Sequence, residues 1–188
     1  MGRREQIIAC TRELYEEKGL AKTSVQDIAD RIGVARSLFY HYFSDKDAVT
    51  SAVLDSYIDE FLAMLKEWNE QRVEGDVDGA LDTLVPRIRR ALFADDSFRR
   101  SLSSRENAAL YIGFMNRVAD QAATYIVETT VQDYRRLHDI EIDHVYETFY
   151  VLALGVVGYL RMHPEADDNV IKDIIAQTLH LERNRAHN

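Results

Sequence analysis

The chain has 188 residues, a mass of 21.7 kDa and a formal net charge of −9 at pH 7, a length that fits one medium domain or a small domain with a larger companion. Hydrophobic residues make up 46% of it and charged residues 29%, which excludes a chain disordered by composition. A single cysteine excludes an intramolecular disulfide framework and a cysteine-rich zinc module. The longest apolar run, Phe149 to Leu160, falls well short of the ~20 residues that span a bilayer, and no apolar segment of a secretory signal follows the basic start. We therefore expect a soluble, cytoplasmic protein with no membrane partner.

The negative charge lies entirely in the part of the chain after residue 50. Residues 1–50 carry eight Lys or Arg and eight Asp or Glu, so this segment is neutral, whereas the remaining 138 residues carry 15 basic and 24 acidic side chains. The global charge therefore does not exclude an anionic partner for the N-terminal segment, where the local geometry decides what is presented.

The hydrophobic pattern predicts an all-α fold of about nine helices. Apolar residues recur with the helical period of 3.6, and the chain contains only two prolines and eight glycines. Pro86 is expected to kink one helix. The predicted helices cover residues 4–18, a second stretch that starts at the run Thr23-Ser24-Val25-Gln26 and ends at Gly33, 36–42, 46–69, 78–94, a short segment opened by Asp95-Asp96-Ser97, 106–138, 143–162, and a last one from Asp167 or Asp168 to Arg183.

Local signals are densest between residues 19 and 42. Gly19 follows the first predicted helix as a C-terminal cap. The run Thr23-Ser24-Val25-Gln26 has the pattern of a capping box and predicts the start of the second helix. Gly33 ends that helix and permits a backbone turn closed to other residues. The sequence thus predicts two short helices joined by Gly33-Val34-Ala35, the dimensions of a helix-turn-helix.

The two helices of this motif would pack through one apolar seam and leave a polar face outside. The seam consists of Ile28, Ala29, Ile32, Val34 and Phe39. The outward face of the third helix then carries Arg36, Ser37, Tyr40 and His41. Such donors and aromatic rings meet phosphates and base edges in a major groove.

The run TSVQDIADRIGVARSLFYHYFSDKDAV, residues 23–49, resembles the DNA-binding domain of the TetR family of bacterial transcriptional repressors. The first helix extends the resemblance to about residues 5–54. The rest of the chain matches that family only in the number and length of its helices. The resemblance implies a three-helix DNA-binding domain in residues 1–46 and a helical ligand-binding and dimerisation domain in residues 47–188.

The resemblance also assigns roles to individual side chains. Phosphate contacts fall on the start of the second helix and of the fourth, base contacts on Gln26 and on the first turn of the third helix, and backbone, sugar or thymine-methyl contacts on its second turn. Ala35 departs from the family, which usually has a capping Ser or Thr there, and Leu38 replaces a small polar residue. Tyr40 has a second interpretation, packing against the first helix. The ten assigned residues are Thr23, Ser24, Gln26, Arg36, Ser37, Leu38, Tyr40, His41, Tyr42 and Lys46.

An aromatic-rich set on the fourth, seventh and eighth predicted helices is a candidate ligand cavity. Pockets are mostly apolar with a few polar groups, and buried tyrosine hydroxyls need partners; an ordinary core is the alternative for each residue. The candidate ligand contacts are Trp68, Tyr111, Phe114, Met115, Tyr125, Tyr146, Phe149 and Tyr150, and Tyr134 belongs to the same aromatic set.

Two small residues three positions apart, Gly155 and Gly158, allow another helix to approach closely. That approach lies either within the core or across a dimer axis, and we favour the dimer, as the resemblance also implies. The candidate interface residues are Gly155, Gly158, Ile171, Ile174, Ile175 and Leu179.

No catalytic or metal-binding pattern accompanies these features. His138, Asp139, Asp143 and His144 straddle a predicted turn and are interpreted as capping and solvated residues, and Cys10 as a small core residue. We therefore expect a regulator that is not an enzyme and has no cofactor or metal. It would be a homodimer that binds a palindromic operator in double-stranded DNA and responds to a small-molecule effector. A helical adaptor or effector-binding protein without DNA readout and a small helical enzyme are the alternatives.

Overall fold

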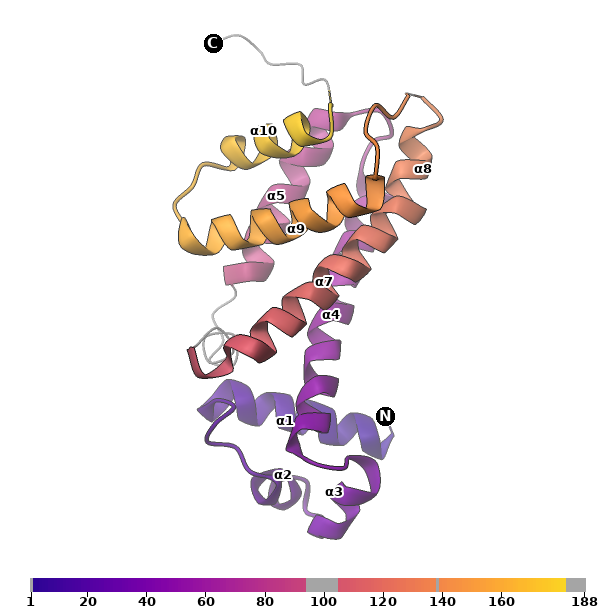
Figure 1. Cartoon of the computed structure of the whole chain (residues 1–188). Helices are drawn as coiled ribbons and strands as arrows, with labels where there is room; N and C mark the ends of the chain where they lie inside the picture. Colours follow the sequence, from indigo (N-terminus) through magenta and orange to yellow (C-terminus); the bar gives the residue numbers. More distant parts are fainter. Residues whose placement is uncertain (1, 94–104, 138, 182–188) are drawn as a thin grey trace. The chain divides into compact units, whose positions relative to one another are not determined.

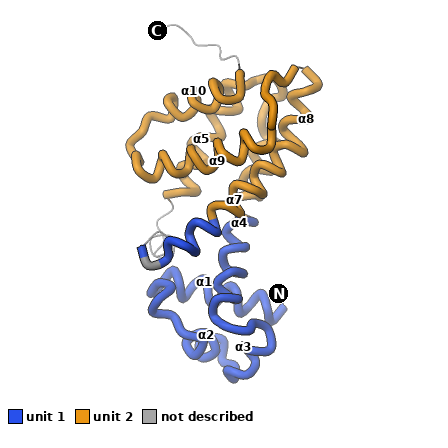
Figure 2. The backbone as a smooth tube through the Cα atoms, in the orientation of Figure 1, with its two compact units in different colours: residues 1–59, 95–114 blue, residues 60–94, 115–188 orange. Residues whose placement is uncertain are grey.

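The computed structural model describes residues 2–93, 105–137 and 139–181, and every regular element in these ranges is helical, as predicted (Figure 1). The chain divides into two compact units, one of residues 1–59 and 95–114 and the other of residues 60–94 and 115–188 (Figure 2). The elements are α1 (Arg3–Lys18), α2 (Val25–Ile32), α3 (Arg36–Tyr42), α4 (Lys46–Gln71), α5 (Val77–Phe93), a 3-10 turn (Arg105–Asn107), α7 (Ala108–Glu128), α8 (Thr130–Tyr134), α9 (Val145–Met162) and α10 (Asp168–Thr178).

The first unit is built around α1, which packs on α2, while α2 packs on α3. Its core combines apolar side chains of all three helices and of the first turns of α4, and a neighbouring cluster adds residues from the start of α7. Since short helices are marginal alone, this shared core stabilises the seven-residue α3. The largest contributors are Ile7, Leu14, Tyr15, Ile28, Phe39, Phe43, Val49, Val53 and Leu54.

The turn between α2 and α3 depends on Gly33. Its backbone adopts the left-handed conformation, with φ 72° and ψ 38°, which costs glycine little and other residues more. The Val34 N–H donates to the Ala29 carbonyl at 3.0 Å, so the last turn of α2 is closed. At the start of α3, Ala35 provides no side-chain cap, as its sequence indicated.

The capping box at the start of α2 is shifted by one residue from the prediction. Ser24 is the N-cap: its Oγ accepts from the Asp27 N–H at 3.1 Å, and the Asp27 carboxylate accepts from the Ser24 N–H at 2.7 Å. Thr23 and Gln26 do not form the box. The Thr23 hydroxyl instead donates to the Gly19 carbonyl at 3.0 Å, inside the unit, where a short polar side chain closes the preceding loop.

The second unit buries the faces shared by α5, α9 and α10. Leu81 and Val85 of α5 meet Leu160 of α9 and Ile171 of α10 in this core. A second cluster surrounds Trp68, near the end of α4. At the edge of the core, the Arg89 guanidinium lies 2.6 Å from the Asp168 carboxylate and donates to the carbonyls of Pro164 and Ala166, which ties α5 to the segment between α9 and α10.

Two predicted helices differ from those of the structure, and a third lies outside the described residues. The helix predicted over residues 106–138 is interrupted at Thr129, whose backbone (φ −122°, ψ −79°) leaves the helical conformation. The Tyr125 carbonyl there accepts from both the Thr129 N–H at 3.1 Å and the Thr129 hydroxyl at 2.7 Å. The last helix ends at Thr178, not Arg183, and residues 182–188 lie outside the described residues. The short helix predicted from Asp95 also lies outside them. The helix around Pro86 continues to Phe93.

A buried hydrogen bond between α1 and α4 gives a stability test of the first unit. The Tyr15 and Thr50 hydroxyl oxygens lie 2.7 Å apart, and both side chains are buried. Tyr15→Phe is expected to lower the free energy of unfolding by about 1 kcal/mol, the usual net value of such a bond, measured by urea denaturation. Tyr42→Phe, which removes an exposed hydroxyl, is the matched control and should leave stability unchanged.

The same bond predicts a pH dependence. Burial raises the pKa of Tyr15 to about 12, whereas an unfolded tyrosine ionises near pH ~10. The contribution of the hydroxyl is therefore complete below that pH and is lost as the pH rises toward the folded value. The stability difference between the wild type and Tyr15→Phe should shrink over this range; a constant difference would contradict the assignment.

Candidate nucleic-acid interface and ligand cavity

The third helix presents one face to solvent because its other face is held in the core. Phe39 is only 1% exposed, and Leu38 is half-buried. Five of the side chains assigned to DNA contacts are exposed on the remaining surface of α3: Arg36, Ser37, Tyr40, His41 and Tyr42. The packing of Phe39 thus selects the outward face that the sequence predicted.

Two side chains on this face, Arg36 and Tyr40, contact each other. The Arg36 Nη2 donates to the Tyr40 hydroxyl at 2.9 Å, and the guanidinium lies 5.4 Å from the Tyr40 ring centroid. The Tyr40 ring in turn meets Phe39 edge-on at 5.5 Å. Within the described part of the chain, the other N–H groups of Arg36 have no hydrogen-bond partner. Arg36 is therefore held at the start of α3 with donors available for a planar acceptor pair such as guanine O6 and N7.

The polar groups at the start of α2 already have hydrogen-bond partners within the protein, which the sequence did not indicate. The Ser24 hydroxyl and N–H both donate to the Asp27 carboxylate, and the Lys18 ammonium lies 3.0 Å from it. These hydrogen bonds, with those from Ser24 the largest cause, hold the pKa of Asp27 well below its usual range. Gln26 is exposed, and its side-chain amide donates to the Asp30 carboxylate at 2.7 Å. A phosphate at this helix terminus would therefore lie beside a carboxylate.

Two of the ten predicted DNA contacts point into the first unit. Thr23 is 2% exposed, so its hydroxyl is withdrawn from the surface, and we no longer propose it as a phosphate ligand. The Lys46 ammonium donates to the Leu20 carbonyl at 2.7 Å, and burial lowers the pKa of this half-buried group. In this structure Lys46 joins the start of α4 to the loop after α1, and a phosphate contact would require that bond to open.

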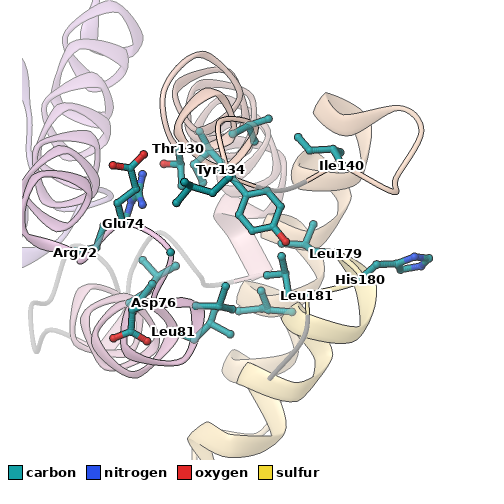
Figure 3. Close-up of a pocket in the computed structure, with 18 of the residues that line it drawn as sticks. Arg72, Glu74, Asp76, Leu81, Thr130, Tyr134, Ile140, Leu179, His180 and Leu181 are labelled. Atoms are coloured by element: carbon teal, nitrogen blue, oxygen red, sulfur yellow. The ribbon is translucent and has the colours of Figure 1, made fainter. Parts of the chain in front are cut away.

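The second unit contains a cavity of about 150 Å³ between the end of α4, the start of α5, α8, and the segments that flank α9 and α10 (Figure 3). Of the eight predicted ligand contacts, Trp68 and Phe149 line it, together with Tyr134. The Trp68 indole N–H donates to the Ala80 carbonyl at 3.0 Å, so its polar end is already satisfied. The aromatic residues of the sequence therefore predicted only part of the wall of this cavity in the second unit.

The other predicted ligand contacts lie elsewhere. Tyr111 and Phe114 pack against the core of the first unit, and Tyr125 packs beside Trp68 without lining the cavity. Tyr146 and Tyr150 lie together near Asp120, whose carboxylate accepts from the Tyr146 hydroxyl at 2.5 Å. Met115 is half-buried and does not line the cavity either.

Aliphatic residues form most of the cavity wall, and none of them was among the predicted ligand contacts. They include Leu81, Leu137, Ile140, Ile142, Val145, Leu179 and Leu181. One signal was present in the sequence: Asp139-Ile140-Glu141-Ile142-Asp143 alternates charged and apolar residues, the pattern of an extended segment with one buried side.

The candidate dimer face needs a partial correction. Ile171 and Ile175 are buried inside the second unit, against α5, and Leu179 packs on the same core, because the inner side of α10 is apolar for its own subunit. Gly155 and Gly158 are exposed, and a Cβ built on either meets no atom within 4 Å. Beside them lies a row of exposed apolar side chains that includes Ile174 and also Val151 (65% exposed), Tyr159, Met162 (78%) and Val170.

Comparison with known proteins identifies the N-terminal part of the chain. Residues 7–53 match the family model described as bacterial regulatory proteins of the tetR family. This segment is therefore similar to the DNA-binding part of that family. This match covers α1 to α3 and the first turns of α4, which are the elements that position the exposed face of α3.

Two relatives of this chain are named as transcriptional regulators. It is 36% identical over 86 residues to the uncharacterized HTH-type transcriptional regulator YvdT of Bacillus subtilis, an alignment covering 45% of this chain and 42% of that protein. It is 24% identical over 184 residues to the transcriptional activator FasR of Mycolicibacterium smegmatis, covering 98% of this chain and 64% of FasR. The chain thus spans less than two thirds of the length of these relatives.

The whole chain shares its fold with a solved TetR-family protein. The repressor AlkX of Dietzia sp. superposes with a TM-score of 0.68 at 17% identity, over 95% of this chain and 96% of AlkX. In the part of the chain that the structure describes, no helix combines the length and apolar composition needed to cross a membrane. Among the same residues, no three His, Cys, Asp or Glu side chains are grouped to hold a metal ion; His138 lies outside the described residues.

The Ser24–Asp27 box provides a test of how α2 is held. Ser24→Ala removes the cap and is expected to lower the free energy of unfolding by about 1 kcal/mol, measured by urea denaturation at pH 7. Ser37→Ala, also exposed but not a cap, is the control and should change stability little.

At acid pH, the stability difference between the wild type and Ser24→Ala is expected to change in one direction. A carboxyl group whose pKa is lowered on folding stabilises the native state above its unfolded pKa and loses that effect as the pH falls. The difference between the wild type and Ser24→Ala should therefore diminish below about pH 4. A difference that grows on acidification would overturn the assigned box.

Proposed function

We propose that this chain is a DNA-binding transcriptional regulator that acts in the cytoplasm, as a homodimer on a palindromic operator, under the control of a small-molecule effector. The observation that carries the proposal is the outward face of α3, with Arg36 and Tyr40 hydrogen-bonded on a helix whose Phe39 is fixed in the core. Relatives named as regulators support it. We propose repression as the mode of control; FasR is named an activator, and a reporter measurement distinguishes the two.

The proposed dimer couples effector binding to DNA binding through geometry. Two recognition helices must reach half-sites about one helical turn, ~34–36 Å, apart or a multiple of it. A small change in their separation prevents both from engaging at once. If the effector favours the wrong separation, DNA must weaken effector binding by the same factor.

Helix α4 supports this coupling. It runs without interruption from Lys46 to Gln71, and Arg72, the residue after its last turn, lines the cavity. At its first residue, Lys46 bonds to the Leu20 carbonyl. Displacement of the C-terminal end of α4 by a ligand would thus act on a helix whose other end is bonded to the DNA-binding motif.

Arg36 separates base reading from simple charge attraction. Arg36→Ala is expected to cost about 1–3 kcal/mol on a duplex selected by the protein from random sequence, and to relax preference at one position per half-site. Arg36→Lys keeps the charge but not the two-donor fork, so it should retain affinity for scrambled duplexes while losing the same discrimination. Binding is measured on both duplexes across a salt series.

Equal losses on selected and scrambled duplexes would make Arg36 a backbone contact and shift base reading to Ser37 and Gln26. Failure of the wild type to select any sequence would overturn the proposed function and favour the adaptor alternative.

The open space at Gly158 provides a test of the dimer. Gly158→Leu meets no atom of its own subunit at the Cβ, so the subunit should fold, while the larger side chain should prevent close approach of a second copy. Sedimentation is expected to show a monomer. Gly113→Leu, at another exposed helical glycine with open space, is the matched control and should remain a dimer. If both variants stay dimeric, the interface does not include the Gly158 face.

A further inference from the structure

The body of the cavity suits a hydrocarbon chain. Fourteen of its lining residues are aliphatic, and three, Trp68, Tyr134 and Phe149, are aromatic. The indole N–H of Trp68 is bonded to the Ala80 carbonyl and the Thr83 hydroxyl, so it does not call for a ligand acceptor. Burial of apolar surface is then the main force available to a ligand inside.

The segment between α8 and α9 divides apolar from charged side chains at this cavity. In Asp139-Ile140-Glu141-Ile142-Asp143, the isoleucines are half-buried and the three carboxylates are exposed. Ile140 is among the residues drawn around the cavity in Figure 3. Successive side chains of an extended segment point to opposite sides, so the segment contributes hydrocarbon to the wall and negative charge to the entrance.

The lining residues carry an excess of negative charge. Four carboxylates, those of Glu74, Asp76, Asp139 and Glu141, belong to the lining, and the one guanidinium there is Arg72. His180 is exposed, and its ring points away from the other labelled side chains (Figure 3). An anionic ligand head would therefore meet mostly like charge.

Arg72 does not offset this excess for a ligand. Its Nη2 lies 2.8 Å from the Asp133 carboxylate, and its Nε donates to the Asn69 side-chain oxygen at 2.9 Å. The Arg72 side chain is only 10% exposed. Drawing Arg72 toward an anion would break its ion pair with Asp133 and leave that carboxylate only the longer 3.4 Å contact with the exposed Arg136.

We propose that the effector taken by this cavity is an aliphatic cation, a hydrocarbon chain that ends in an ammonium-type head. The chain lies against the aliphatic wall, and the head lies at the entrance beside the exposed carboxylates of Asp139 and Glu141. The inference rests on the proposed function for its regulatory meaning, but the binding itself is measured independently of DNA.

Three probes that share one chain length test the head group. Butyltrimethylammonium, butanol and butanoate, whose four-carbon chains suit a cavity of about 150 Å³, are titrated calorimetrically into the full-length protein. The cation is expected to bind about tenfold or more tightly than butanoate, with butanol between them, and added salt should weaken the cation alone. Butanoate binding as tightly as the cation, or no binding by any probe, overturns the proposal.

The entrance carboxylates are tested by the double variant Asp139→Asn/Glu141→Gln. Both side chains are exposed, so the fold should tolerate the change. We expect about a tenfold loss of cation affinity, with butanol affinity unchanged as proof that the cavity is intact. Glu165→Gln is the control, because Glu165 follows the other end of the 18-residue α9, roughly 27 Å along its axis. Unchanged cation affinity in the double variant, or an equal loss in the control, contradicts the assignment.

Selection of a DNA sequence from a random pool, measured on the same protein preparation, distinguishes failure of the proposed function from failure of the proposed effector class. If the protein selects an operator but prefers butanoate, only the inference about the effector fails. If it binds the cation but selects no DNA, the proposed function fails while the cavity assignment stands.

Discussion

Burial of Phe39 is the constraint on which the DNA-binding part of this protein depends. The helix that carries it has seven residues and no side-chain cap at its start, so it has little stability of its own. Its position comes from Phe39 and Phe43 in the core of the first unit and from the left-handed turn at Gly33. Once Phe39 is inside, the helical period leaves Arg36, Tyr40 and their neighbours outside.

Sequence reasoning located this motif well because its signals are local. The end of α2 and the bounds of α3 agree with the prediction, since a glycine and a short apolar seam determine them within a few residues. The errors were also local: Ser24, not Thr23, caps α2. Whether a threonine hydroxyl faces solvent or a neighbouring carbonyl depends on the packing of Gly19 and Leu20, which sequence spacing does not specify.

The second unit was less predictable because its features depend on tertiary contacts. The cavity is lined mostly by aliphatic residues from α5, α7, α8, α9, α10 and the loops beside them, and nothing in a leucine or isoleucine distinguishes a cavity wall from a filled core. The apolar residues of α10 posed the same problem: Ile171 is buried in its own subunit and Ile174 is exposed, although both fit an interface pattern. The alternation of charged and apolar residues over Asp139–Asp143 is present in the sequence, but Asp139 and Asp143 were interpreted only as capping and solvated residues, so this signal did not predict the cavity.

The proposed DNA binding depends on contact between the outward face of α3 and the duplex. The most direct measurement follows the backbone amide signals of labelled protein by NMR as a selected operator duplex is added. The account predicts that the largest changes fall on Arg36 to Tyr42 and on the exposed start of α2, with smaller ones elsewhere in the first unit. Changes centred on the α9 and α10 surface, with α3 unaffected, would contradict it.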